Sequence, residues 1–159
     1  MPALLGFAIF LTMFFASIIS KNGDSYYSGL ELAFGRVYYL FGTEVSRIMF
    51  SPLITLAYIL PLILTGLIVV FTFLNSLKTI KIIKIVTMFV FLLSAISLLT
   101  IMNIAQIRTP ELIGDGYNFS NFADTDLYRL TFGTIIALIL SFIGCGLIAT
   151  DLALETFKK

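Results

Sequence analysis

Carboxylate side chains gather in the polar segment between residues 106 and 128, and oxygen ligands of this kind are the ones that divalent cations prefer. The candidates are Asp115, Asp124 and Asp126. An EF-hand loop takes its calcium ligands from alternate positions and closes on a glutamate, and the spacing of these three aspartates does not follow that pattern. We therefore expect no metal site in this segment.

The other side chains that carry chemistry in proteins are scarce in this chain. Histidine, the usual general base near neutral pH, is absent. Cys145 is the only cysteine, which excludes an intrachain disulfide, a CxxC redox pair and a cysteine-based zinc site. No HExxH, GxSxG or phosphate-binding loop occurs in the sequence. We predict a protein that is not an enzyme and that carries no cofactor.

The composition instead indicates a membrane protein. Of the 159 residues, 59% are hydrophobic and only 12% are charged, whereas soluble domains carry about 25% charged residues. A water-soluble fold of this length does not hide so much apolar surface, so we expect the lipid bilayer to cover it. A formal net charge of +1 provides no basic field for nucleic acid, which we do not expect as a partner.

Four long apolar runs predict an all-α integral membrane protein, a four-transmembrane-helix bundle that forms a single domain over residues 1–159. A spanning helix needs about 20 apolar residues. The first run could instead be a secretory signal peptide, but no Lys or Arg precedes it. The expected membrane helices cover residues 3–19, 53–74, 85–105 and 130–149, with an outer loop at 20–50, a connector at 75–84, a second outer loop at 106–128 and a tail at 150–159.

Residues 26–50 are open to two interpretations. Apolar residues recur there at spacings of three and four, which predicts an amphipathic helix lying at the membrane surface. The alternative is a short strand pair around residues 36–41, between two glycines. Tyrosine rings favour headgroup depth, and the residues expected at this interface are Tyr26, Tyr27, Tyr38 and Tyr39.

Two features of the second expected helix concern its backbone. Ser51 and Pro52 are typical of an N-cap and a first helical residue, where a serine oxygen accepts a free N–H and proline has none to satisfy. Pro61 lies inside the helix and leaves the carbonyl one turn earlier without its usual donor, which predicts a kink.

The connector indicates the orientation of the chain. It contains Lys78, Lys81 and Lys84 and no acidic residue, and basic residues in short loops favour the cytoplasmic side. Both termini then also face the cytoplasm. On this assignment the inner side carries five basic and two acidic residues, and the outer side five basic and seven acidic. The lysines also suit anionic lipid headgroups, each contributing about 1 kcal/mol near the surface.

The fourth expected helix has a face of small residues. At about 100° per residue, these positions fall within one arc, and small side chains allow helices to approach closely in lipid. The partner of this face is a helix of the same chain or of another chain. The residues are Thr134, Ala137, Ser141, Gly144 and Cys145.

Hydroxyl side chains form stripes on the two middle helices. Such stripes line a polar pathway in some transporters, but no charged residue lies at the middle of any expected span, where ion pumps and proton-coupled transporters carry one. We expect the hydroxyls to bond to the backbone or to a neighbouring helix. On the second helix they belong to Tyr58, Thr65 and Thr72, and on the third to Thr87, Ser94 and Ser97.

The layout of four helices with a longer first outer loop resembles the claudin-type tetraspan plan in its topology. The first loop contains neither the tryptophan nor the cysteine pair of that family's signature. We predict a non-catalytic membrane protein, an accessory subunit or scaffold that contacts other membrane protein subunits through its helices and loops. The alternative is a small transporter or channel protomer that forms a pathway on oligomerisation.

Overall fold

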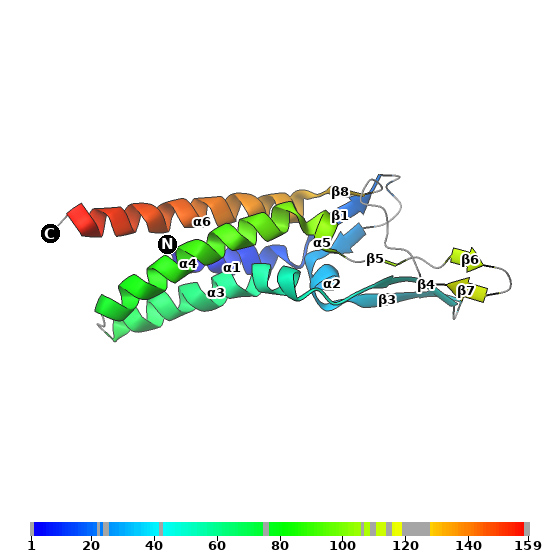
Figure 1. Cartoon of the computed structure of the whole chain (residues 1–159), viewed down its shortest axis with the longest axis horizontal. Helices are drawn as coiled ribbons and strands as arrows, with labels where there is room; N and C mark the ends of the chain where they lie inside the picture. Colours follow the sequence, from blue (N-terminus) through cyan, green and yellow to red (C-terminus); the bar gives the residue numbers. More distant parts are fainter. Residues whose placement is uncertain are drawn as a thin grey trace.

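The computed structural model describes residues 2–21, 23, 26–41, 43–74, 77–105, 107–108, 111–113, 116–118 and 128–157. Helices predominate, and the strands lie together at one end of them (Figure 1). The helices are α1 (Pro2–Thr12), α2 (Gly29–Phe34), α3 (Pro52–Phe73), α4 (Leu77–Leu99), α5 (Ile101–Ile104) and α6 (Phe132–Phe157). The strands are β1 (Ala16–Ser20), β2 (Tyr26–Ser28), β3 (Arg36–Leu40), β4 (Thr43–Ile48), β5 (Ile107–Arg108), β6 (Glu111–Ile113), β7 (Gly116–Asn118) and β8 (Tyr128–Leu130).

Three helices, α3, α4 and α6, are long and apolar enough to cross a membrane. Helix α1 has 11 residues, which corresponds to about 16 Å at 1.5 Å per residue. A bilayer core is about 30 Å thick, so α1 covers about half of it. The prediction of a fourth spanning helix is therefore not confirmed.

The predicted first membrane helix over residues 3–19 is wrong beyond Thr12. The last turn tightens, because the backbone N–H of Met13 donates to Phe10 and that of Phe14 to Leu11, at distances of 3.1 and 3.2 Å. Residues 16–20 then form β1, which pairs on one side with β2 and on the other with β8. These partners are distant in the sequence, so a local apolar run does not reveal them.

The first outer loop contains strands, and the predicted amphipathic helix over residues 26–50 is wrong. Only α2 is helical there. Gly35 ends it with φ +80°, a conformation that residues with a side chain rarely adopt. The β-branched and aromatic residues that follow favour strands, and β3 pairs antiparallel with β4, as in the alternative interpretation. An all-α fold is therefore also wrong, because small sheets are present.

Helices α4 and α6 extend beyond the predicted spans at their ends away from the strands. Helix α3 lies within a residue of the expected 53–74 at each end. Helix α4 begins at Leu77, so the lysines assigned to a connector lie on a helix. Helix α6 continues to Phe157, through most of the segment expected to be a tail.

The strands form two three-stranded sheets, in the orders β2-β1-β8 and β3-β4-β5, and a separate pair β6-β7. The end of α3, the start of α4 and the end of α6 lie at the opposite end of the bundle, whereas α1 begins partway along it (Figure 1). The core lies where α1, α3, α4 and α6 meet. Its fully buried side chains include Ile9, Tyr58, Phe91, Leu98 and Ile148.

Candidate functional site

The small-residue face of α6 packs within this chain. The hydroxyl of Thr134 donates to the backbone oxygen of Ser17 at 2.9 Å. Ala137 and Ser141 are fully buried, and a Cβ added at Gly144 would lie 2.6 Å from the ring of Phe91 on α4. Cys145 is a free thiol that is partly exposed. The partners of this face are therefore α4 and the segment that follows α1.

Pro61 and Ser94 are linked through one backbone carbonyl. Proline has no N–H, so the oxygen of Ala57, four residues earlier, has no donor within α3. The hydroxyl of Ser94, from α4, donates to this oxygen at 2.6 Å. It also lies 3.3 Å from the hydroxyl of Ser141 on α6. A polar side chain of α4 thus supplies a hydrogen bond to the backbone of α3 and also contacts α6.

Several other buried hydroxyls also have hydrogen-bond partners. The hydroxyl of Tyr58 lies 3.2 Å from that of Ser17. Thr65 donates to the oxygen of Pro61 at 2.7 Å, and Thr87 donates to that of Ile83, also at 2.7 Å. Ser97 is buried and Thr72 is exposed. Thr65 and Thr87 donate within their own helices, so their hydroxyls present no free donor to a solute.

Helix α1 approaches α3 through a glycine that the sequence analysis did not single out. A Cβ added at Gly6 would lie 2.6 Å from the backbone oxygen of Pro61 and would collide with the hydroxyl of Thr65. Only glycine permits this contact. Small residues let membrane helices approach closely, and Gly6 follows this rule. The sequence of the apolar run alone does not show which helix Gly6 contacts.

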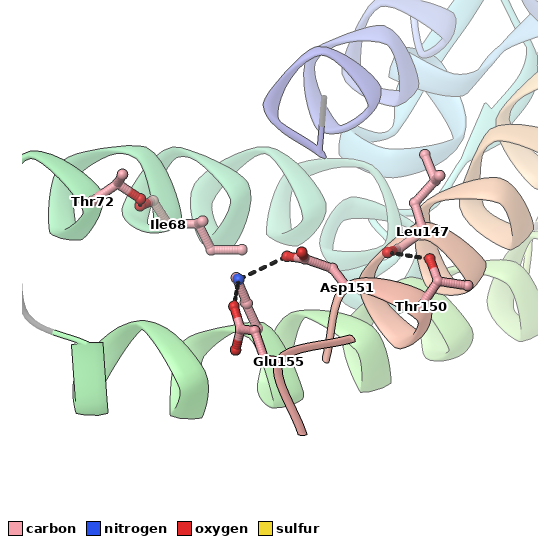
Figure 2. Close-up of polar contacts among 7 residues, drawn as sticks. Ile68, Thr72, Leu147, Thr150, Asp151 and Glu155 are labelled. Carbon is pink, nitrogen blue, oxygen red and sulfur yellow. Dashed lines mark hydrogen bonds and ion pairs between the residues drawn. The ribbon is translucent and has the colours of Figure 1, made fainter. Parts of the chain in front are cut away.

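An ionic cluster joins α4 and α6 near their ends away from the strands (Figure 2). The ammonium of Lys84 lies 2.7 Å from a carboxylate oxygen of Asp151 and also contacts Glu155. The Lys84 side chain is only 13% exposed, whereas both carboxylates are about half exposed. Lys78 and Lys81, by contrast, are exposed. The cluster was missed because residues 150–159 were predicted to be a tail, although carboxylates four residues apart share a helix face.

Tyrosines occupy both faces of the outer sheets instead of a single interface. Tyr27 is buried and its ring lies 5.9 Å from that of Tyr128 and 6.0 Å from that of Tyr38. Tyr26 and Tyr39 point outward, because successive strand residues face opposite sides. At the end of β3, Phe41 has φ +50° and a fully exposed ring.

Charged groups bind to this aromatic cluster. The guanidinium of Arg36 lies 5.0 Å from the centre of the Tyr38 ring and 2.5 Å from a carboxylate oxygen of Glu31. The other carboxylate oxygen accepts the backbone N–H of Ser28 at 2.9 Å, which closes a capping box at the start of α2. These contacts fix α2 against the strands.

The same contacts shift the acidity of these groups. Burial alone would raise the pKa of Glu31, but hydrogen bonds from Ser28, Tyr38 and Arg36 hold this pKa below its usual value. Burial raises the pKa of Tyr128 to about 12, with a further contribution from Tyr27. The cluster therefore keeps Glu31 charged and Tyr128 neutral at physiological pH.

The three aspartates considered for a cation, Asp115, Asp124 and Asp126, lie outside the described residues. Within the described part of the chain, no group of three His, Cys, Asp or Glu side chains can hold a metal ion. Comparison of this chain with family models, with curated proteins and with solved structures finds no match. Its function must therefore be argued from its own geometry.

Proposed function

We propose that this chain is a non-catalytic integral membrane protein that acts as an accessory subunit or scaffold of a membrane assembly. Its outer sheets provide the surface for a partner, and its helices provide the anchor. The observation that carries the proposal is the exposed aromatic side of the strand-rich end. Tyr39 is 65% exposed and the ring of Phe41 is fully exposed. Aromatic side chains are enriched at protein interfaces.

The interior of the bundle supports this function over a transport pathway. Thr65 and Ser94 are almost completely buried, and both donate to backbone oxygens of α3. A channel formed on oligomerisation would instead present these hydroxyls to a shared aqueous axis.

We further propose that the strand-rich end faces outward and that the inner ends of α3, α4 and α6 face the cytoplasm. The end of α3, the start of α4 and the end of α6 lie at the same end of the bundle (Figure 1), as expected if this end is inside. Lys78 and Lys81 lie at this end, in agreement with the bias of short basic loops toward the cytoplasm. Helix α1 then crosses only the outer half of the bilayer.

The experiment that tests the proposed function is crosslinking of the tagged chain in native membranes, followed by gentle detergent extraction and quantitative mass spectrometry. We expect a stoichiometric partner of different sequence, crosslinked through residues of β3 or the β3–β4 turn. Alanine replacement of Tyr39 and Phe41 should reduce its recovery, whereas replacement of Phe50, exposed but outside the strands, should not. Recovery as a defined homo-oligomer alone would contradict an accessory subunit.

A cysteine test separates the scaffold from the pore. In a Cys145→Ala background, Thr65→Cys and Ser94→Cys should remain unreactive toward a polar thiol reagent, and Tyr39→Cys, which is exposed at the strand-rich end, serves as the reactive control. Rapid modification at both buried positions in the membrane would favour the transporter or channel.

A further inference from the structure

A groove lies between the start of α1 and the second half of α3. A cavity of about 260 Å³ lies below the start of α1, against one face of α3. Pro2 and Ala3 close its outer end, and its wall is formed by Thr65, Ile68, Val69, Thr72 and Phe73. Because α3 has 22 residues and α1 has 11, the lower part of this face of α3 has no α1 residue beside it.

The lining of the groove suits a hydrocarbon chain. Its only hydroxyls are those of Thr65 and Thr72, and both donate to backbone oxygens of α3, at 2.7 and 2.6 Å. The groove therefore has an apolar wall with no side-chain donor left for a polar solute. In a membrane such a wall is covered by a lipid tail or by another helix.

The charges around the groove favour a lipid with an anionic headgroup. Lys78 and Lys81 lie in the first turns of α4, directly after the short connection from the groove-lining Phe73, and both are exposed. Within the described chain, neither forms an ion pair. Lys84 does not compete for a phosphate, because Asp151 and Glu155 already bind it. Figure 2 shows the Ile68 side chain extending toward this ionic cluster.

We propose that the groove binds one acyl chain of an anionic glycerophospholipid of the inner leaflet, with the phosphate at Lys78 and Lys81. The acyl chain lies along the residues of α3 that line the groove. The site is independent of the accessory-subunit function, since it needs no protein partner and lies at the opposite end of the bundle from the outer sheets.

The test uses the full chain in vesicles of equal parts phosphatidylglycerol and phosphatidylcholine, with a photoactivatable diazirine in the acyl chain of one lipid at a time. We expect the phosphatidylglycerol probe to crosslink to residues 65–73 and native mass spectrometry to retain one such lipid per chain. Equal labelling by both lipids, or labelling spread over all lipid-facing helices, would overturn the proposal. Crosslinking of residues 65–73 to a second protein chain would also overturn it.

Two groove-filling variants and a matched control locate the site. Ala3→Phe and Val69→Phe place a ring into the groove from its two sides, and each should abolish the crosslink to residues 65–73. Leu4→Phe adds a ring at the adjacent, lipid-facing position of α1 and should leave the crosslink intact. Circular dichroism and size-exclusion chromatography check the fold of each variant. If both filling variants fold and retain the lipid, the groove is not its site.

A second pair of variants tests the headgroup. Lys78→Gln and Lys81→Gln should each lower retention of phosphatidylglycerol about fivefold, the ratio that corresponds to about 1 kcal/mol. Lys21→Gln, at the other end of the molecule, should have no effect. Unchanged selectivity for phosphatidylglycerol in the double lysine variant would contradict the assignment of the phosphate.

Discussion

At the scale of single residues, the bundle is specified by a few close approaches and by one shared carbonyl. Gly6 lets α1 contact the backbone of α3 beside Pro61, and Ser94 supplies the donor that this proline cannot. Lipid tails are as apolar as the side chains that face them, so packing and interhelical hydrogen bonds hold membrane helices together. Both contacts act on the same turn of α3.

Replacement of Gly6 by alanine should destabilise the bundle by about 1–3 kcal/mol, the usual cost of overpacking. The added methyl group would lie 2.6 Å from a backbone oxygen that cannot rotate away. Gly66→Ala is the matched control, since a Cβ there meets no atom of the described chain within 4 Å. Thermal unfolding in detergent, followed by circular dichroism, measures both. Equal midpoints for the two variants would contradict the close contact.

Ser94→Ala should cost about 1–2 kcal/mol in a background with Pro61, because the Ala57 carbonyl loses the donor that Ser94 supplies. The same substitution should cost much less beside Pro61→Ala, since alanine at position 61 restores the N–H that bonds to Ala57. A double-mutant cycle on the unfolding free energy measures this coupling. Strictly additive effects would show that Ser94 acts through something other than the Ala57 carbonyl.

At the scale of elements, long apolar runs predict α3, α4 and α6 well, because length and composition alone define a spanning helix. Three local signals were misleading. The run over residues 3–19 is continuous, yet its second part pairs with strands far along the chain. The lysines of residues 78–84 were assigned to a loop because of their charge, although lysine is a good helix former. The three-and-four spacing in residues 26–50 arose by chance on strands.

The candidate site was predictable only in part, because local sequence signals do not identify tertiary partners. Spacing on a helix is enough to place Thr134, Ser141 and Gly144 on one face, and the structure buries that face. Spacing does not reveal which helix comes opposite, so the Ser94–Ala57 bond and the Lys84 cluster require the packing of α3, α4 and α6.

The Lys84 cluster should couple the inner ends of α4 and α6 by about 0.5–1 kcal/mol, as for partly exposed ion pairs. Lys84→Met leaves two carboxylates without their cation and should lower the unfolding temperature. Adding Asp151→Asn to this variant should recover part of the loss. Lys81→Met, one turn away and exposed, is the control. The pairing is wrong if a cycle between Lys84 and Asp151 shows no coupling energy.

The capping carboxylate of α2 should make the outer end sensitive to acid. The folded pKa of Glu31 lies below its ordinary value of 4.5, so the stabilisation is present above this value and is lost as the pH falls through the folded pKa. We expect the difference in unfolding temperature between the parent and Glu31→Gln to shrink below pH 4.5. A difference that stays constant from pH 7 to pH 3 would show that the charge of Glu31 is unimportant.

At the scale of the whole molecule, polar and aromatic groups are divided between two ends. The strands, the tyrosine cluster and Glu31 lie at one end, and the lysines with the ends of α4 and α6 lie at the other (Figure 1). This division gives each face of a membrane a different surface. The chain therefore has two possible orientations in the membrane, with the strand-rich end either outside or in the cytoplasm.

Cysteine labelling in intact cells should give the outward orientation of the sheets. In a Cys145→Ala background, Tyr39→Cys should react with a membrane-impermeant maleimide, because that side chain is exposed at the outer end. Leu74→Cys, exposed after α3, should react only after the cells are permeabilised. The opposite pattern would invert the proposed topology and place the sheets in the cytoplasm.

The pairing of β1 with β8 has a consequence for the order of biosynthesis. Ile18 lies opposite Leu130, and Ser20 opposite Tyr128, so one of the first strands to leave the ribosome completes its sheet with one of the last. Until β8 arrives, one edge of β1 offers unpaired N–H and C=O groups to any other strand. A chain that stops before residue 128 would keep this edge open. The arrival of β8 thus marks the point at which the nascent chain closes this edge of β1.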